Sequence, residues 1–278
     1  MKIKIFSCNH VLPKHEISTN LFQTFVSGLT PEQGSRTLSD VSGRNIAERH
    51  KFCEMRHQYY IWQNTLAQYD YVGFEHYRRL FYLDPLSLDN LKTRYPKLHN
   101  LRGNLAELPL DFITDIHEPG IFGEIHESRS SFNQEDELRI ENWIASHDIL
   151  YTQPMFQNVE ENIRNFHGNA FHLWKELEKT LSTSRSFSSL RNYVNSSLPW
   201  SGYLNMYIMR SDLFCAYMDE IFPVLLDLDD KYPDAPSRIW GHFTERLLGA
   251  FLIQKMVETP MLRCKPIPHL VFDRNACD

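Results

Sequence analysis

The chain has 278 residues, of which 42% are hydrophobic, and its formal net charge is -6 at pH 7. This length lies near the upper size of one compact domain, so we expect a single domain over residues 1–278, with an insertion or acceptor lobe at roughly 83–146. A protein that binds a nucleic-acid backbone normally carries a basic excess, so the charge argues against nucleic acid as a partner. Any anion site must therefore be local.

Targeting and redox signals point to the cytoplasm. No window approaches the ~20 apolar residues that a membrane helix requires, and the first ten residues lack the apolar segment of a signal peptide. The five cysteines are scattered without a Cys-x-x-Cys pair, which favours neither a disulfide framework nor a zinc ribbon. We expect a cytoplasmic protein that can work at the inner face of the membrane.

The predicted elements alternate between strands and helices. In chain order they are a strand at 2–7, a helix at 18–28, a polar loop at 30–43, a helix at 44–69, a strand from 71, an irregular stretch at 83–123, a helix at 134–146, a strand at 148–151, helices at 158–182 and 186–195, a strand at 203–209, helices at 211–228 and 243–256, and a strand at 267–272. Such an order is typical of an α/β fold with a mixed, mostly parallel central sheet flanked by helices.

The helix predicted at 44–69 carries an apolar stripe that would pack on this sheet. Its members recur three or four positions apart: Phe52, Met55, Tyr59, Trp62, Leu66 and Tyr69. Within it His50, Glu54 and His57 would share one helical face, which allows a metal-site hypothesis. Their spacing is not a protease zinc motif, so we expect Glu54 instead to orient an arginine of the next segment.

The segment after this helix is the most informative in the chain. An apolar strand, Tyr71-Val72-Gly73-Phe74, runs into Glu75-His76-Tyr77-Arg78-Arg79. Open α/β sheets bind ligands at the carboxyl ends of their strands, and paired guanidinium groups suit a diphosphate. The sequence therefore predicts an anion site at Arg78 and Arg79, although a solvated basic turn would give the same letters.

Several motifs together resemble a bacterial family of capsule and O-antigen glycosyltransferases that was first described as a domain of unknown function. They are Gly43-Arg44-Asn45-Ile46, Phe52-Cys53-Glu54, Tyr60-Ile61-Trp62-Gln63-Asn64, His76-Tyr77-Arg78-Arg79, Tyr203-Leu204-Asn205-Met206-Tyr207-Ile208-Met209, Ile221-Phe222-Pro223-Val224-Leu225 and Thr244-Glu245-Arg246-Leu247-Leu248. The resemblance implies a GT-A-like, Rossmann-like fold and inverting transfer of galactose, in pyranose or furanose form, from a UDP-sugar to a growing polysaccharide. The acceptor would be a saccharide or a lipid-linked glycan, and a peripheral membrane or polysaccharide-assembly complex is a possible setting.

Many GT-A enzymes stabilise the leaving diphosphate with a metal held by an Asp-x-Asp motif. Here the corresponding place holds the segment from Glu75 to Arg79, without Asp-x-Asp. Our hypothesis is that Arg78 and Arg79 replace the metal, so no metal ligand and no cofactor are expected. Glu75 would repel a diphosphate unless it is paired.

The resemblance also suggests a catalytic base. Glu245 follows an aromatic, glycine-containing loop and is predicted in the first turn of a helix, where inverting GT-A enzymes carry the acid of their xED-type motif. The alternative is a structural glutamate stabilised by the helix dipole. Asp115, Glu118 and Glu75 would be the next candidates.

Further site residues come from the same comparison. The donor is expected to contact Asn9, His10, Asp40, Asn45, Glu54, His76, Tyr77 and Asn205. The acceptor is expected to contact Trp200, Tyr203 and Trp240, because aromatic faces stack on sugar rings. Asp40 and Asn45 could equally cap the following helix, and a Trp is as often a core residue. Two alternatives stay open: a noncatalytic nucleotide-sugar or carbohydrate-binding module, and a metal-dependent hydrolase built on His50, Glu54 and His57.

Overall fold

The computed structural model describes residues 1–81, 83, 113–116, 121–152, 158–184, 187–188, 190–195, 203–267 and 269–272. The strands are β1 (Ile3–Asn9), β2 (Phe22–Val26), β3 (Leu38–Ser39), β4 (Tyr71–His76), β5 (Arg79–Phe81), β6 (Ile113–Ile116), β7 (Ile149–Thr152), β8 (Tyr207–Arg210), β9 (Cys264–Ile267) and β10 (His269–Phe272). The α-helices are α1 (Met55–Asn64), α4 (Ile121–Ser130), α5 (Gln134–Ala145), α6 (Val159–His167), α7 (Phe171–Leu181), α8 (Leu190–Asn195), α9 (Ser211–Lys231) and α10 (Ile239–Glu258). Short 3-10 turns lie at His50–Phe52, Leu66–Gln68, Gly168–Ala170 and Tyr203–Asn205.

The strands form one mixed sheet. Strands β3, β2, β1 and β4 lie side by side and are parallel. The far edge of β4 is shared: Tyr71 to Phe74 pair antiparallel with β8, whereas His76 pairs with Arg79 of β5. Strands β7 and β9 continue the sheet beyond β8, and β10 and β6 continue it beyond β5. The carboxyl ends of β1, β2 and β4 therefore meet at one edge, where an α/β sheet receives its ligand.

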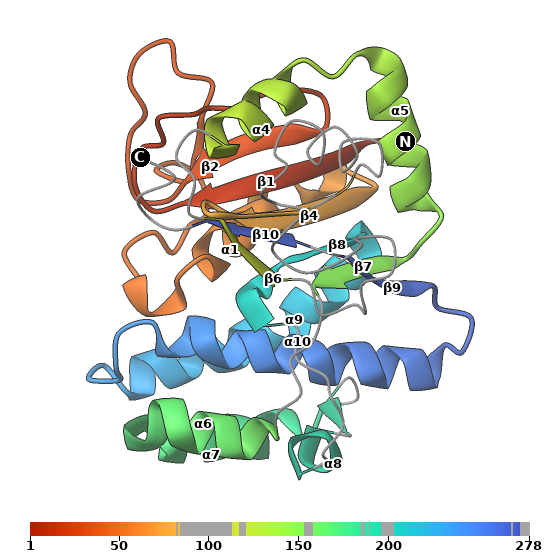
Figure 1. Ribbon diagram of the computed structural model, residues 1–278. Coiled ribbons are helices and arrows are strands. Elements are labelled where there is room, and N and C mark those ends of the chain that lie inside the picture. Colours follow the sequence, from red (N-terminus) through yellow and green to blue (C-terminus); the bar gives the residue numbers. More distant parts are fainter. Residues whose placement is uncertain are drawn as a thin grey trace.

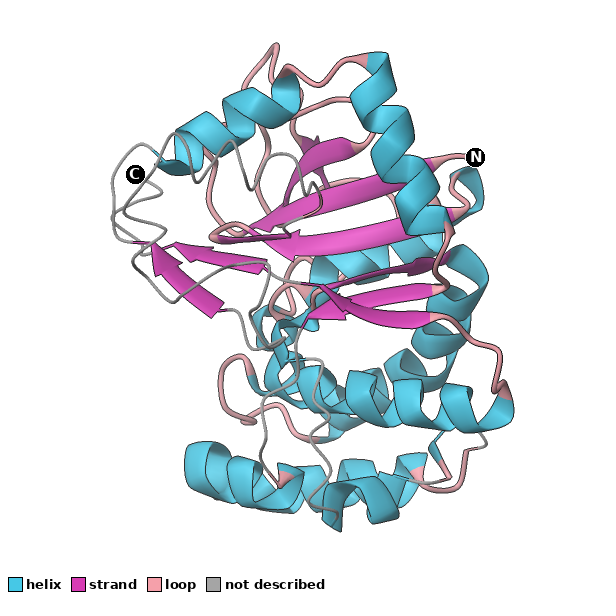
Figure 2. Cartoon of the chain, turned by 45° about the vertical axis from the view of Figure 1, so that its right-hand side comes forward, coloured by secondary structure: helices cyan, strands magenta, loops and turns pink. Residues whose placement is uncertain are grey.

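Helices cover both faces of this sheet. In Figure 1, α4 and α5 lie on one side and α1, α9 and α10 on the other, with α6, α7 and α8 as an outer layer beyond α10. Figure 2 shows the same layers after a 45° turn. Two buried clusters match the two faces, since Val72 and Phe74 of β4 belong to the cluster that contains α9 and α10, whereas Tyr71 belongs to the other. Successive side chains of a strand alternate between faces, which accounts for this division.

Two predicted helices are wrong. Residues 18–28 were expected to be helical, but β2 occupies Phe22–Val26. Phe22, Phe25 and Val26 are buried, and apolar residues so spaced fit a helix as well as a strand covered on both sides. The expected helix at 44–69 is broken at Cys53, whose φ of 50° is not helical, so that α1 begins only at Met55. The stripe was predicted to pack on the sheet, but of its residues in α1 only Met55 is fully buried, and the rings of Tyr59 and Trp62 contact Phe222 of α9 instead. Tyr60, outside the stripe, contacts Phe25 of β2.

Among the described residues, no helix combines the length and apolar character needed to cross a membrane.

Candidate active site

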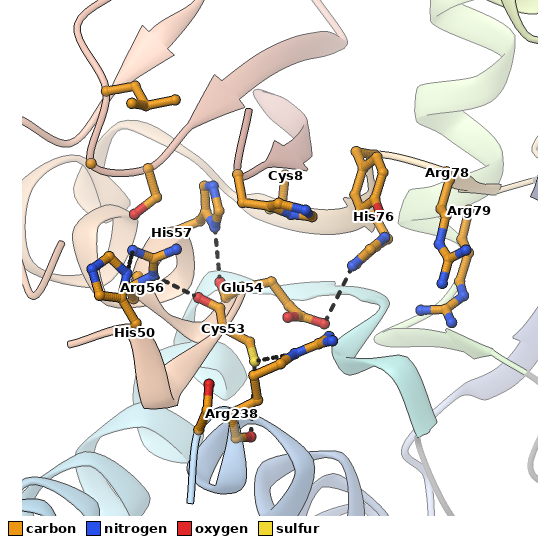
Figure 3. A pocket seen from close by; sticks show the side chains of 16 residues that line it. Cys8, His50, Cys53, Glu54, Arg56, His57, His76, Arg78, Arg79 and Arg238 are labelled. Carbon is orange, nitrogen blue, oxygen red and sulfur yellow. Dashed lines mark hydrogen bonds and ion pairs between the residues drawn. The ribbon is translucent and has the colours of Figure 1, made fainter. Parts of the chain in front are cut away.

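A cavity of about 410 Å³ opens at the carboxyl edge of β1, β2 and β4. It is lined from five directions: the end of β1, the turn after β2, the segment around Cys53, the β4–β5 turn and the residues before α10 (Figure 3). The lining side chains include Cys8, His10, Ser27, His50, Cys53, Glu54, Arg56, His57, His76, Tyr77, Arg78, Arg79 and Arg238. Four of these are arginines and one is a carboxylate, so the cavity favours an anion.

The β4–β5 turn directs two arginines into this cavity. Because His76 pairs with Arg79 across a two-residue turn, the chain reverses directly after β4. Figure 3 shows the guanidinium groups of Arg78 and Arg79 side by side on one wall. Burial lowers the pKa of Arg79, and the neighbouring Arg78 lowers it further. The Nε atom of Arg78 is buried and has no hydrogen-bond partner among the described residues. Two adjacent cations, one with an unused donor, form a site suited to a dianion.

Glu75 does not face this cavity. It lies between Phe74 and His76 on β4 and therefore points to the opposite face of the sheet. There its carboxylate accepts a hydrogen bond of 2.7 Å from Arg129 of α4 and one of 3.1 Å from the backbone N–H of Phe81. The charge of Glu75 is thus compensated, and it does not oppose an anion beside Arg78 and Arg79.

His76 forms the wall between the arginines and Glu54. Its Nε2 lies 3.8 Å from Oε1 of Glu54. Burial lowers the pKa of His76 well below its ordinary value, and Arg79 and His10 act in the same direction. The imidazole is therefore neutral near pH 7. The His10 ring packs edge-on against the neighbouring Tyr77, with 4.5 Å between the ring centroids.

Two carboxylates, Glu54 and Glu245, lie close enough for the charge of Glu245 to affect the pKa of Glu54. Burial raises the pKa of Glu54 to about 7, and the nearby charge of Glu245 raises it as well, while Arg238 and Arg79 oppose the shift. Burial also raises the pKa of Glu245, against Arg246, Arg79 and Arg238. Strongly perturbed acids in a cavity are typical of catalytic sites.

Glu245 stands deeper in its helix than predicted. Helix α10 begins at Ile239, so Glu245 lies in the second turn and the expected loop around Trp240 is helical. The dipole effect falls off within the first turn, so the alternative of a structural glutamate stabilised by the helix dipole is weakened. The Glu245 carboxylate forms an ion pair with Arg246 over 2.7 Å and accepts a hydrogen bond from the N–H of Leu204.

Backbone strain concentrates around these carboxylates. Among the described residues, the four non-glycine positions with positive φ are Cys53, Leu204, Asn205 and Arg238. Cys53 directly precedes Glu54, and its thiol contacts the carbonyl oxygen of Arg238, which lies just before α10. The N–H of Leu204 is bonded to Glu245, and Asn205 donates to the carbonyl oxygen of Gly241 in α10. Such conformations cost about 1–3 kcal/mol each and occur preferentially at functional sites. Gly241 allows the close approach, since an added Cβ would lie 2.8 Å from the Cβ of Cys53.

Several predicted donor residues have structural contacts instead. Asp40 is fully buried and accepts from Ser27 Oγ and from the N–H of Gly28, which fixes the turn that lines the cavity. Asn45 is exposed and accepts from the N–H of Ala47, away from the cavity lining. Asn205 is buried and donates to Gly241 O. These three are therefore not cavity-lining residues.

Asn9 borders a second cavity of about 310 Å³, beyond His10 and Tyr77. Its carbonyl oxygen lies 2.9 Å from Nε2 of His57. His57 Nδ1 lies 3.2 Å from the carbonyl oxygen of Glu54, and burial lowers the pKa of His57 to about 4. His50 instead contacts Arg56. Within the described part of the chain, no group of three His, Cys, Asp or Glu side chains is arranged to hold a metal ion, so the structure does not bring His50, Glu54 and His57 together as ligands.

The expectation that Trp240 binds the acceptor is wrong. Its side chain is fully buried, and its indole N–H donates to Asp229 over 2.8 Å. The helical start of α10 turns it into the core. Trp200, the side chain of Tyr203 and Glu118 lie outside what the structure describes, as does most of the predicted insertion.

Sequence analysis missed Cys53, Arg56 and Arg238 as cavity residues. Arg238 Nε lies 3.3 Å from the sulfur of Cys53, a contact across 185 residues. No motif surrounds Arg238, and its left-handed conformation, with φ of 67°, is set by tertiary packing. The helix break at Cys53 could not be predicted, because the stripe residues on either side of it, Phe52 and Met55, keep helical spacing.

The architecture is similar to that of a solved glycosyltransferase. The apo structure of WbbM, a bifunctional glycosyltransferase, matches with a TM-score of 0.73 and 20% sequence identity over 99% of this chain and 46% of that chain. This chain thus spans less than half the length of WbbM. The likeness concerns the fold, and it confirms the predicted GT-A-like arrangement of a mixed sheet flanked by helices.

A family model, described as a domain of unknown function and named DUF4422, matches residues 4–256. The chain therefore belongs to the DUF4422 family. No curated protein matches it.

Proposed function

We propose that this protein is a glycosyltransferase that moves a sugar from a UDP-sugar to a saccharide acceptor. The observation that carries the proposal is the pair of adjacent guanidinium groups, Arg78 and Arg79, which share one cavity at the carboxyl edge of the sheet with the carboxyl group of Glu54. A leaving diphosphate needs positive charge, and an acceptor hydroxyl needs a base. The WbbM-like fold and the DUF4422 membership are consistent with this assignment.

In this proposal the diphosphate of the donor lies against Arg78, Arg79 and Arg238. The nucleoside extends toward Ser27 and Gly28, at the turn held by Asp40. The arginines stabilise the charge that develops on the departing UDP, without a divalent metal. The transferred sugar is galactose, as pyranose or furanose, the transfer inverts its anomeric centre, and the acceptor is a growing capsule or O-antigen polysaccharide or a lipid-linked precursor.

The proton acceptor belongs to the carboxylate pair of Glu54 and Glu245. Sequence analysis assigned this role to Glu245, and Glu54 was expected to position an arginine. Both acids have raised pKa values, so either is a better base near neutral pH than an exposed glutamate. Acceptor contacts by Trp200 and Tyr203 stay predictions.

The test is a panel of UDP-sugars, with thermal unfolding and UDP release as readouts. A ligand that binds the folded state stabilises it by mass action, so UDP and the true donor should raise Tm. The cognate UDP-sugar should also release UDP catalytically, which a noncatalytic binding module would not do. A protein that is stabilised by no uridine nucleotide and releases no UDP would refute the proposal.

A further inference from the structure

Glu54 lies at a helix-capping position, but its side chain does not cap the helix. It is the N-cap residue of α1, yet its side chain accepts no hydrogen bond from the first turn of that helix. Ser, Thr, Asp and Asn normally fill this position because their short side chains cap the free N–H groups. In Figure 3 the Glu54 carboxylate turns instead into the cavity, toward His76. A local structural role therefore does not explain it.

The two carboxylates of the site differ in what surrounds their oxygens. Glu245 is held by Arg246 at 2.7 Å and by the N–H of Leu204, and it is not among the cavity-lining residues. Glu54 lines the cavity, and the hydrogen bond it accepts is from its own backbone N–H rather than from an arginine. The exposed fractions of the two side chains, 12% for Glu54 and 13% for Glu245, are nearly equal, so the cavity lining and the Arg246 pair are what distinguish them. The separation of 3.8 Å between Glu54 and His76 is longer than a hydrogen bond. A substrate hydroxyl in the cavity can therefore reach Glu54 more directly than Glu245.

The surroundings of Glu54 keep it protonatable near neutral pH. The groups that face it are Cys53 on its own segment, Cys8 of β1, Arg56 of α1, His76 of β4, Arg79 of β5, Arg238 before α10 and Glu245 in α10. His76 is neutral, and burial raises the pKa of the Cys53 thiol to about 12, so neither is charged at pH 7. Glu245 raises the pKa of Glu54, while Arg238 and Arg79 limit the rise. A base with a pKa near the working pH transfers protons most efficiently.

The geometry points to Glu54 as the catalytic group that takes the proton from the acceptor hydroxyl, with Glu245 as a positioning residue beside it. This inference rests on the proposed glycosyl transfer. The acceptor oxygen forms a bond to the anomeric carbon as its proton passes to Glu54. The bond from that carbon to the phosphate oxygen breaks, and its electron pair leaves with UDP beside Arg78 and Arg79. Protonated Glu54 then returns its proton to solvent.

The experiment measures UDP release from the UDP-sugar that the wild type turns over fastest, with water as the acceptor, so that no glycan need be known. Glu54→Gln is nearly isosteric but takes up no proton, and it should lower the rate by about 100-fold or more. UDP should still raise its Tm by the wild-type amount. Glu54→Asp keeps a carboxylate and should retain more activity than Glu54→Gln. The matched control is Glu48→Gln, because Glu48 is an exposed glutamate six positions earlier, and its rate should equal that of the wild type.

The pH profile separates the two acids. Wild-type activity should fall as the pH drops through the pKa of Glu54, about 7. Glu245→Gln removes the negative charge that raises this pKa, so its acidic limb should move to lower pH while the limb itself persists. In Glu54→Gln the limb should disappear.

Two failures can be told apart. A wild type that releases UDP while Glu54→Gln keeps both the rate and the acidic limb would overturn the role of Glu54 and leave the proposed function intact. The same holds if Glu245→Gln alone abolishes the limb, since Glu245 would then be the base. A wild type that neither binds UDP nor releases it would overturn the proposed function, and this inference with it.

Discussion

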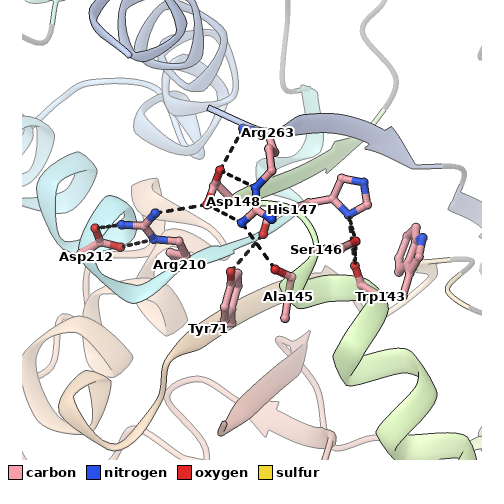
Figure 4. A network of polar contacts seen from close by, with 9 residues as sticks. All are labelled: Tyr71, Trp143, Ala145, Ser146, His147, Asp148, Arg210, Asp212 and Arg263. Carbon is pink, nitrogen blue, oxygen red and sulfur yellow. Dashed lines mark hydrogen bonds and ion pairs between the residues drawn. The ribbon is translucent and has the colours of Figure 1, made fainter. Parts of the chain in front are cut away.

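Strand β4 carries a cluster of charged residues at each end, and the two clusters use similar residues to opposite effect. At its amino end the Asp148 cluster consists of Asp148, Arg210, Asp212 and Arg263 (Figure 4). At its carboxyl end the Glu54 cluster consists of Glu54, Glu245, His76, Arg79 and Arg238. Both combine acids with arginines next to the sheet.

The Asp148 cluster is fully paired. Asp148 accepts a 2.8 Å hydrogen bond from the N–H of Arg263 and further bonds from the guanidinium groups of Arg263 and Arg210. Burial alone would raise the pKa of Asp148, but these bonds outweigh it and bring the pKa to about 2. The cluster ties β7, β8 and the start of β9 together, so its charges stabilise the fold.

In the Glu54 cluster, Glu245 is paired with Arg246, but Glu54 and Arg79 are not paired with each other in this way. Glu54 has a raised pKa and Arg79 a lowered one, because burial acts on both. In the free protein, ionisation of each group costs more free energy than it does in water, and an anionic ligand would offset this cost at Arg79. Unfavourable electrostatics held in place by the fold distinguish a binding or catalytic cluster from a stabilising one.

The largest expected effect is on activity at the arginine pair. Arg78→Ala and Arg79→Ala should each cost roughly 2 to 4 kcal/mol of transition-state stabilisation, or about 30- to 900-fold in rate, because each removes a preorganised charge from the diphosphate. UDP release at saturating donor measures the loss. Arg36→Ala, at an exposed arginine, is the control and should have no effect. Rates within twofold of wild type for both variants would contradict the proposed role of Arg78 and Arg79 in stabilising the diphosphate.

Stability should change in opposite directions at the two clusters. Because the pKa of Glu54 is raised from 4.5 to about 7, the folded state binds the proton more tightly than the unfolded state, and stability is lost as the pH rises from about 4.5 to 7. Glu54→Gln removes this loss, so at pH 8 it should stabilise the protein by up to about 3 kcal/mol. Thermal unfolding at pH 8 and pH 4 measures the difference, which should vanish at the lower pH. A Glu54→Gln protein less stable than wild type at pH 8 would show that the carboxylate supports the fold.

Asp148→Asn should destabilise the protein by about 2 kcal/mol at pH 7 without lowering UDP release per folded molecule. The pKa of Asp148 is lowered, so its stabilisation is present above the ordinary pKa of 3.8 and is lost as the pH falls toward 2. The difference between variant and wild type should therefore shrink over that range. Asp212→Asn is the matched control, because Asp212 is 60% exposed and its ion pair should contribute less than about 1 kcal/mol. An Asp148→Asn variant that folds normally but releases UDP slowly would show that the Asp148 cluster affects activity as well as stability.

The smallest expected effect is that of a chelator. If the arginines supply the charge that a metal supplies elsewhere, EDTA should change the rate of UDP release by less than twofold, and added manganese should not increase it. Strict dependence on a divalent cation would instead make Glu54 and Glu245 candidate ligands and would contradict the role of Arg78 and Arg79.

Local patterns were enough to predict much of the fold. The strands β1 and β4 and the helices α5 and α9 lie where alternation and helical spacing placed them, because each pattern has one stable way to bury its apolar side chains. Strand β2 was mistaken for a helix, since its pairing with β1 and its burial on both faces come from the rest of the sheet. Cys53 was placed inside a helix because its backbone conformation depends on the contact with Gly241 and Arg238.

The sequence by itself determined that Arg78 and Arg79 lie just past the carboxyl end of β4, because they follow its apolar residues within a few positions. That they face a cavity rather than solvent was decided by the tertiary structure. The sequence also did not determine which acid would face them. Glu54 and Glu245 lie 191 positions apart, and Glu245 raises the pKa of Glu54 only because α10 packs against the segment at Cys53. Trp240 was misassigned for the same reason, since its helix begins earlier than the sequence indicated. Strand and turn chemistry act over a few residues, whereas electrostatic coupling depends on distances that only tertiary packing decides.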